Sequence, residues 1–124
     1  MIRLNKVLMY SLIIGIGIAL VGCGGGGKYG DPVPTDMPAK QIKEILAAPD
    51  QFDGKIVKVE GKIGEECPSG CWFYIEDGTG RIYVDINPAG FAIPQKVGSK
   101  VAIIGKVKKA EAKVAIFGTG VEIK

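Results

Sequence analysis

Hydrophobic and polar residues alternate along most of the chain after residue 54, as in strands with one buried and one exposed face. In the segment 55–63, Val57, Val59 and Ile63 share one face, and lysine and glutamate fill the other. Strands are predicted at 55–63, 72–76, 81–86, 99–107 and 113–123. The sequence Asp77-Gly78-Thr79-Gly80 favours a tight hairpin turn between the second and third of these strands.

A short amphipathic helix is expected before the first strand. Thr35 or Asp36 can cap it, and Pro38 fits its first turn because the missing N–H has no partner there. Its apolar stripe consists of Ile42, Ile45 and Leu46. Pro49 is expected to end the helix, which then covers one end of a sheet.

Five short strands and one helix within residues 38–124 predict an all-β domain, a small closed antiparallel barrel with Greek-key connections. Closure is favoured over an open sheet because it removes exposed edges. The segment 87–97 contains Pro88 and Pro94, so a loop or a single helical turn is expected there.

The beginning of the chain has the order of an export signal. Residues 1–6 carry two positive charges, and residues 7–21 are almost wholly apolar but shorter than the ~20 residues of a membrane-spanning helix. The following Leu20-Val21-Gly22-Cys23 resembles the lipobox of bacterial lipoproteins. This resemblance implies a lipoprotein signal peptide over 1–22 and a Cys23 that carries acyl chains such as palmitate as a membrane anchor.

Residues 23–37 are expected to form a flexible tether, because glycines 24–27 and the Pro-containing stretch after them cannot bury a core. About 15 extended residues at ~3.3 Å each would let the domain stand ~50 Å from the membrane. Gly24 is not the aspartate associated with inner-membrane retention in the lipoproteins that the leader resembles. We therefore expect the periplasmic face of the outer membrane, or the cell surface, rather than the inner membrane.

Charge and composition exclude several classes of function. The formal net charge is +3, and from residue 23 onward 14 basic residues face 13 acidic ones. A strongly cationic nucleic-acid binder is therefore not supported. The chain has no histidine, which excludes a Ser-His-Asp or Cys-His catalytic pair and any His-ligated metal. No catalytic residue, metal or cofactor is predicted.

The domain resembles a known group of proteins over nearly all of residues 41–124. The resemblance rests on the segments IKEILAAPDQFDGKIVKVEGKI, GCWFYIEDGTGRIYVDI, GFAIPQKVGSKVAIIGKV and GVEIK. They look like the small exported bacterial OB-fold lipoproteins related to the tRNA-anticodon-binding OB group. The most specific element is Cys67-x-x-x-Cys71-Trp72. The resemblance implies a five-stranded OB barrel and export, and it brings no established activity.

Cys67 and Cys71 are an even pair once Cys23 is set aside for lipidation. A disulfide between them is favoured, since the intervening Pro and Gly allow a reversal and the compartment preserves disulfides. Two alternatives stay open. Redox activity normally uses Cys-x-x-Cys at a helix start. Metal binding would need further ligands from Glu65, Glu66 or a second chain.

Alternation in the second and third strands places aromatic residues on the outside of the barrel. The inward positions are Phe73, Ile75, Ile82, Val84 and Ile86. The outward positions are Trp72, Tyr74, Glu76, Arg81, Tyr83 and Asp85. OB folds use exposed aromatics with an arginine to stack bases or sugars. The predicted ligand contacts are Trp72, Tyr74, Arg81 and Tyr83, with Lys106, Lys108 and Lys109 near one end of the same groove.

These observations favour a membrane-anchored, exported and non-catalytic binding module. Its expected ligand is a protein, a glycan or a small molecule. Nucleic acid ranks lower because Glu76 and Asp85 would repel phosphates. The alternative is a thiol-based redox or metal-handling protein that uses Cys67 and Cys71.

Overall fold

The computed structural model describes residues 26–124, and the expected signal peptide (1–22) and lipidated Cys23 lie outside them. The elements are β1 (Gly27–Gly30), α2 (Ile42–Ala47), α3 (Pro49–Phe52), β2 (Ile56–Glu66), β3 (Trp72–Glu76), β4 (Arg81–Asp85), the 3-10 helix η1 (Asn87–Ala89), β5 (Lys100–Ala110) and β6 (Lys113–Ile123). The predicted strands 72–76 and 113–123 coincide with β3 and β6, and η1 is the single turn expected after β4.

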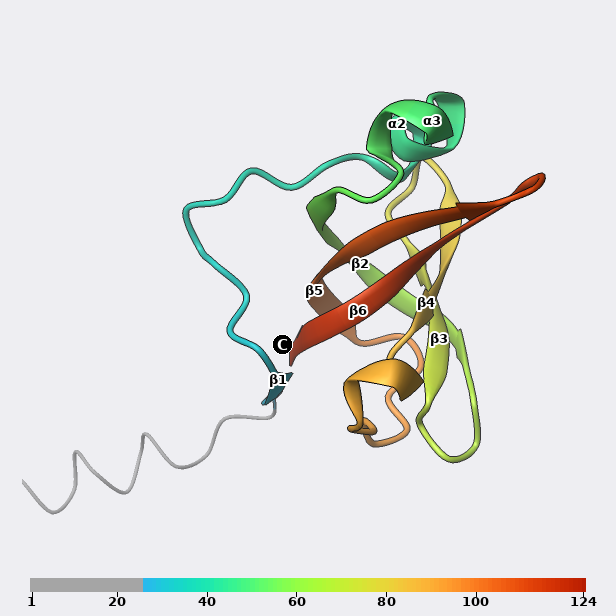
Figure 1. Ribbon diagram of the computed structural model, residues 1–124. Coiled ribbons are helices and arrows are strands. Elements are labelled where there is room, and N and C mark those ends of the chain that lie inside the picture. Colours follow the sequence, from blue (N-terminus) through green and yellow to red (C-terminus); the bar gives the residue numbers. More distant parts are fainter. Residues whose placement is uncertain (1–25) are drawn as a thin grey trace, which may run out of the picture.

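Strands β2 to β6 close into a barrel (Figure 1). The hydrogen-bonded order is β6-β4-β3-β2-β5, and β5 pairs again with β6 to complete the circle. One detail differs from the expected antiparallel barrel, because β4 and β6 run parallel, with Tyr83 opposite Ala115 and Asp85 opposite Phe117. After β4 and η1, strand β5 runs in the opposite direction to β4. Strand β6 is antiparallel to β5 and therefore points in the same direction as β4. The all-β prediction is confirmed, and the barrel is mixed.

The barrel interior is filled by the residues that alternation had placed there. Phe73, Ile75, Ile82, Val84 and Ile86 are all at most 2% exposed. Ile42 and Ile45 of α2 are fully buried and join the same core, so the helix covers one end of the barrel. Leu46 is 43% exposed, and its expected place in the apolar stripe is wrong. Of the residues of α2, only Ile42 and Ile45 are buried.

The helix begins later than its sequence suggested, at Ile42 rather than near Pro38. Its first N–H groups are bound by the β3–β4 turn instead of by Thr35 or Asp36. The Ile42 N–H donates to Asp77 Oδ2 (2.9 Å), and the Lys43 N–H donates to Thr79 Oγ1 (3.2 Å). Pro49 ends α2 and starts α3. A turn distant in sequence therefore fixes where the helix starts.

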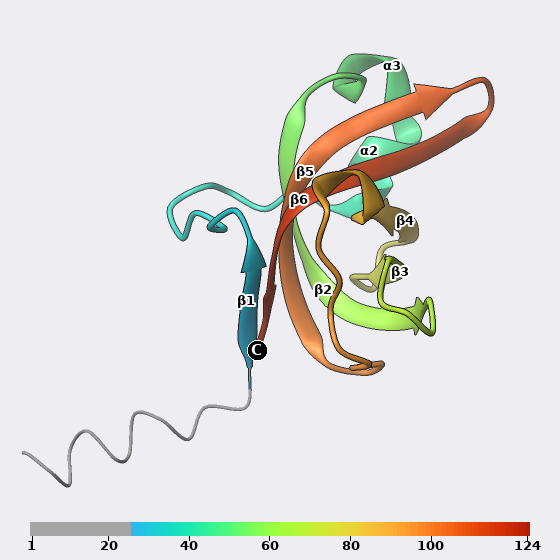
Figure 2. The ribbon, with the colours of Figure 1, turned by 60° about the horizontal axis from the view of Figure 1, so that its bottom comes forward.

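The segment before α2 lies along the barrel. Figure 2 shows β1 beside the last part of β6, where Gly27 pairs with Ile123 and Gly30 with Gly120. Strand β4 pairs only with residues 115–117 of β6, so the rest of that edge has free backbone groups that β1 satisfies. The tether expected over 23–37 is therefore not free at residues 27–30. The tether was predicted because this segment cannot bury a core, but pairing of its backbone with a strand edge needs no apolar side chains.

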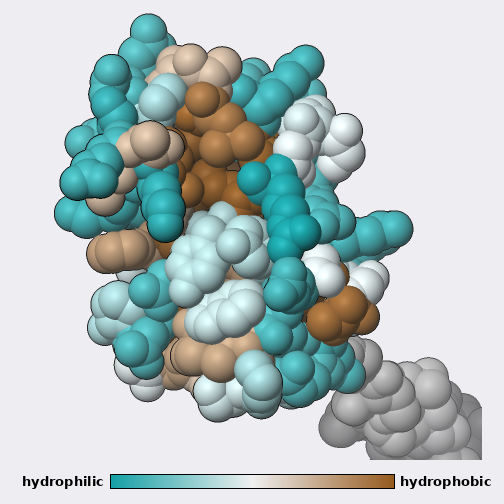
Figure 3. All heavy atoms as spheres, turned by 90° about the vertical axis from the view of Figure 1, so that its right-hand side faces the viewer, coloured by the Kyte–Doolittle hydropathy of each residue, from teal (hydrophilic) through white to brown (hydrophobic). Residues whose placement is uncertain are grey.

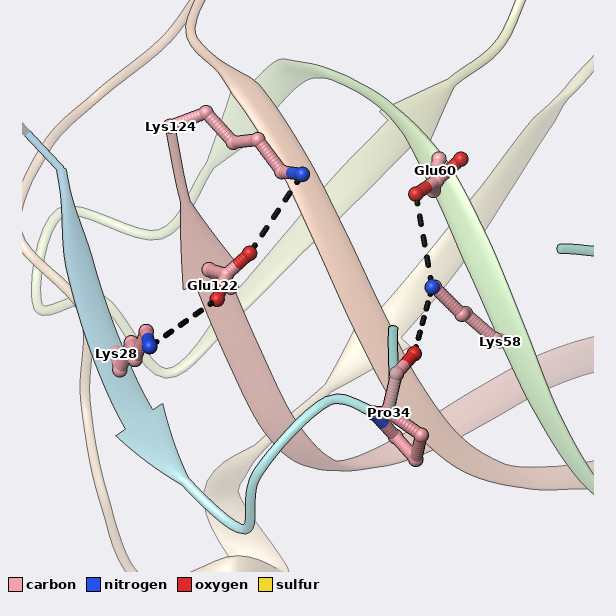
Figure 4. A network of polar contacts seen from close by, with 6 residues as sticks. All are labelled: Lys28, Pro34, Lys58, Glu60, Glu122 and Lys124. Carbon is pink, nitrogen blue, oxygen red and sulfur yellow. Dashed lines mark hydrogen bonds and ion pairs between the residues drawn. The ribbon is translucent and has the colours of Figure 1, made fainter. Parts of the chain in front are cut away.

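Side-chain contacts fasten this segment further (Figure 4). Lys58 of β2 is 6% exposed, and its Nζ donates to the Pro34 carbonyl (2.7 Å) and lies 3.8 Å from Glu60 Oε2. Glu122 of β6 lies between Lys28 (3.8 Å) and Lys124 (3.6 Å). The segment thus covers the outer side of β2, β5 and β6 and leaves β3 and β4 uncovered (Figures 1 and 2).

Within residues 26–124, no helix has the length and apolar character needed to cross a membrane.

Candidate functional site

Three aromatic rings stand together on the outside of β3 and β4. Trp72 and Tyr83 are stacked with ring centres 5.6 Å apart, and Tyr74 meets both edge-on, at 5.9 Å from Trp72 and 5.4 Å from Tyr83. Each of the three is half-buried. We call Trp72, Tyr74, Tyr83 and the adjacent Arg81 the aromatic face. The structure brings together these four predicted residues, as alternation required.

Arg81 lies over the aromatic face, with its guanidinium carbon 3.9 Å from the centre of the Tyr74 ring. Two carboxylates hold it there: Nη2 donates to Glu65 Oε1 (2.6 Å), and Nη1 lies 3.9 Å from Glu76 Oε2. Planarity lets a guanidinium stack on a ring and bind carboxylates at its edge at the same time. Its charge is therefore already compensated, which weakens any attraction for a phosphate.

Glu65 is a member of this site that the sequence analysis missed. Strict alternation from the buried Ile63 would turn Glu65 into the barrel. A register shift between these two residues instead pairs Glu65 with Tyr74 on the outside. Gly64, where the shift occurs, was the signal that could have indicated it, because glycine within a strand often marks a bulge.

The predicted lysines divide into two groups. Strand register continues the aromatic face across β6 to β5, so Tyr83, Ala115 and Lys108 form one row. Asp85, Phe117 and Lys106 form the next row, and Lys108 Nζ lies 5.8 Å from the centre of the Phe117 ring. Lys106 and Lys108 therefore lie on the predicted side, two strands away from Tyr83.

Lys109 does not belong to this face, and its predicted place is wrong. Its neighbour on β6 is Val114, so it points to the opposite side of the sheet. Its Nζ donates to Asp50 Oδ1 (2.6 Å), and this ion pair raises the pKa of Lys109 above its ordinary value. The odd position of Lys109, directly after the outward Lys106 and Lys108, was the available signal.

Tyr83 occupies the middle of the aromatic face. Desolvation, and then the negative charge of Asp85, raises the pKa of its phenol, so it stays a neutral hydrogen-bond donor at physiological pH. Figure 3 shows this side of the molecule, where residues of intermediate hydropathy gather beneath an apolar hollow and hydrophilic ones border them.

Residues 67–71 connect β2 to β3 beside Trp72. The two sulfur atoms lie 2.8 Å apart and are thiols in this structure. The predicted disulfide between Cys67 and Cys71 stays a prediction, with both partners in reach of one another. Among residues 26–124, no group of three acidic, cysteine or histidine side chains is placed to hold a metal ion.

A second hollow, of about 620 Å³, lies beyond Glu76. Both charge signs line it: its charged residues are Glu60, Lys62, Glu76, Asp77, Lys100 and Lys124. Lys62 stands opposite Glu76 on one side and Lys100 on the other. With its charges mixed in this way, the hollow favours no ligand of a single charge.

Comparison with protein-family models and with curated proteins gave no match. Solved structures do match. The hypothetical protein ygiW from E. coli is 22% identical, with a TM-score of 0.57 over 77% of this chain and 100% of that one. Asparaginyl-tRNA synthetase from Pyrococcus horikoshii is 22% identical, with a TM-score of 0.55 over 70% of this chain and 23% of that one. The chain has the OB fold.

A third structure, the S. pombe Stn1-Ten1 complex, is more distant, with 20% identity and a TM-score of 0.44 over 69% of this chain and 77% of the other. In OB terms, β2 to β6 are the five barrel strands, and β3 and β4 are the second and third. OB folds bind ligands on that face and on the two loops beside it. Here these loops are 67–71 and the β5–β6 turn. The OB part of the predicted resemblance is confirmed, and its lipoprotein part remains a prediction.

Proposed function

We propose that the domain is a non-catalytic binding module whose ligand lies on the aromatic face. The observation that carries this proposal is the cluster of Trp72, Tyr74 and Tyr83, left half-exposed on the one side that the N-terminal segment does not cover. Large rigid rings lose little conformational entropy on binding, and this makes them strong anchors for a ligand.

The charges around the rings support an uncharged ligand. Glu65, Glu76 and Asp85 balance Arg81, Lys106 and Lys108 on this side of the barrel. Nucleic-acid binding depends on lysine and arginine that are free to replace counterions at phosphates. We therefore favour a protein, a glycan or a small neutral molecule, with nucleic acid last. The two lysines at the far side could meet a polar end of such a ligand.

The aromatic face can be tested through Trp72, the only tryptophan of the chain. We expect a neutral oligosaccharide or peptide ligand to shift or quench its emission. Tyr74→Ala and Tyr83→Ala should each weaken binding by about 1–3 kcal/mol, because each removes a stacking surface. The measurement is a fluorescence titration at physiological salt.

Tyr29→Ala provides the matched control, since Tyr29 lies on β1 and packs against the core away from the rings. It should leave the affinity unchanged. A single-stranded oligonucleotide of mixed sequence completes the set and should bind weakly or not at all at physiological salt. Tight oligonucleotide binding that resists salt would reverse our ranking of ligands.

We also propose that the mature protein is exported and anchored through an acylated Cys23, at the outer membrane or the cell surface. The support is the order of charged, apolar and LVGC segments in residues 1–23. Cys23→Ser should abolish incorporation of radioactive palmitate and release the protein from membranes, because one thiol carries the whole anchor. Membrane association that persists without lipid label would identify the leader as an uncleaved anchor instead.

A further inference from the structure

The loop 67–71 holds two thiols and a hydroxyl in mutual contact. The Cys71 thiol donates to Cys67 Sγ at 2.8 Å, and Ser69 Oγ lies 3.1 Å from Cys67 Sγ and 3.7 Å from Cys71 Sγ. Cys67 is 8% exposed, whereas Cys71 is half-buried at the end of the aromatic face. One sulfur can therefore meet a molecule from solvent, and the other lies directly behind it.

The backbone of this loop is fixed from several sides. Within the loop and to Trp72, the Gly70 N–H donates to the Cys67 carbonyl (2.8 Å), and the Cys67 N–H donates to the Trp72 carbonyl (2.9 Å). From outside, Gln95 Nε2 donates to the carbonyls of Cys67 (2.7 Å) and Pro68 (3.1 Å). A sulfur–sulfur bond of about 2.05 Å would need each sulfur to move by less than ~0.5 Å. The loop can thus close and reopen a disulfide without rearranging.

Proton sharing prepares the pair for reaction. Hydrogen bonds from Cys71 and Ser69 lower the pKa of Cys67 to about 6, and the same bond to Cys67 raises the pKa of Cys71. Near pH 7 the two sulfurs accordingly share one proton, and the pair has one negative charge. A thiolate is the form that attacks a disulfide, and moving the shared proton to Cys67 exposes that form at Cys71.

We propose that Cys67 and Cys71 form a thiol–disulfide exchange site that reacts with the disulfide of a small thiol or of a peptide. The Cys71 thiolate attacks one sulfur of R–S–S–R, forms Cys71–S–S–R and releases RS⁻. Cys67, after giving up its proton, attacks Cys71 Sγ, forms the Cys67–Cys71 disulfide and releases the second RS⁻. The shared proton of the pair and one proton from water end on the two released thiolates, so the pair is oxidised by two electrons and the co-reactant disulfide is reduced to two thiols.

This role goes beyond ligand binding and does not depend on it. The reaction can be followed without any ligand for the aromatic face, so the two proposals fail separately. It also differs from an inert structural disulfide, which would form once and resist exchange.

The test uses the full-length chain with Cys23→Ser, so that Cys67 and Cys71 are its only thiols. The reduced chain is mixed with oxidised glutathione and followed by intact mass. We expect each chain to lose two hydrogens without a lasting adduct, and reduced glutathione in excess to reverse the change. Cys67→Ser should stop after the first step and keep one glutathione on Cys71. Cys71→Ser should slow that first step by at least about tenfold, because Cys67 is buried.

A second set keeps both cysteines and so avoids variants that fail to fold. The rate of the wild-type reaction should rise with pH through a midpoint near 6, the pKa of Cys67. Ser69→Ala should move that midpoint upward, since it removes a hydrogen bond to the thiolate. Ser99→Ala, at the serine directly before β5, should leave the midpoint unchanged. A disulfide-linked peptide dimer is the other co-reactant. If the dimer reacts faster than oxidised glutathione, and if Tyr83→Ala slows the reaction with the dimer, the co-reactant disulfide is that of a peptide.

Failure of both disulfides to oxidise the pair would overturn the proposal. So would a Cys67–Cys71 disulfide that excess glutathione cannot reduce, or a pH midpoint near the ordinary thiol value of 9.0.

Discussion

Replacing Phe73 by alanine should cost about 3–5 kcal/mol of the free energy of unfolding, the largest single effect expected in this domain. Phe73, the second residue of β3, is fully buried and is the largest of the fully buried side chains in residues 26–124. Its removal leaves a cavity that the closed barrel cannot collapse to fill. Since domains of this size are stable by only ~5–15 kcal/mol, the variant should unfold at a much lower urea concentration.

Phe117→Ala is the matched control. Phe117 lies on the outside of β6 in the row of Asp85 and is half-buried. Its loss should cost about 1 kcal/mol, the ordinary range for a partly exposed side chain. Equal losses at the two positions would show that the outer side of β6 is covered like a core, and would contradict an accessible aromatic face.

Asp77→Ala should be the next most damaging change, at about 2–3 kcal/mol. One carboxylate oxygen accepts the Thr79 N–H (2.9 Å), the Thr79 hydroxyl (2.6 Å) and the Gly80 N–H (3.2 Å). The other accepts the Ile42 N–H. The substitution therefore loosens the β3–β4 turn and the start of α2 together. Asp50→Ala, whose side chain is 82% exposed and paired only with Lys109, should cost much less.

The effect of Asp77 should depend on pH in a defined direction. Burial opposes its charge, but hydrogen bonds from Thr79, Ile42 and Gly80 prevail and lower the pKa of this carboxyl below its ordinary value of 3.8. Its contribution to stability is thus complete above the unfolded-state pKa and is lost as pH falls through the lower folded-state pKa. Unfolding curves of the wild type and Asp77→Ala should differ by a constant amount above pH 5 and converge below pH 4. A difference unchanged down to pH 2 would assign the stabilisation to packing.

Much of the barrel followed from alternation alone. The inward set from Phe73 to Ile86 and the bounds of β3 and β6 needed only the period of two and the turn residues after Glu76. The aromatic face followed from the same period, because its members lie on two paired strands. Alternation is enough to predict which way a side chain faces where every second residue of a strand meets the same surroundings.

The sequence failed where a distant segment decided the outcome. The start of α2 depends on Asp77, which lies 35 residues from its bonding partner Ile42. Lys109 lies on the other side by register and binds Asp50 there, and Glu65 turns outward because of the register shift at Gly64. The thiol contacts of Cys67 depend on how Gln95 and Ile93 hold the loop. Gly64 and the odd position of Lys109 are local signals, whereas the contacts of Asp77 and of the loop 67–71 cannot be read from spacing within one segment.

Strand β1 has a consequence for where the domain can work. Only residues 24–26 separate Cys23 from Gly27, which is already paired with β6. With Cys23 acylated as we propose, the extended segment that joins the bilayer to the barrel is about 10 Å long instead of the ~50 Å expected for a free tether. The aromatic face would then sample a thin layer next to the lipid headgroups instead of the depth of the compartment. Ligands carried in or delivered to that layer would meet it at a high effective concentration, and partners on an opposing membrane would lie beyond its range.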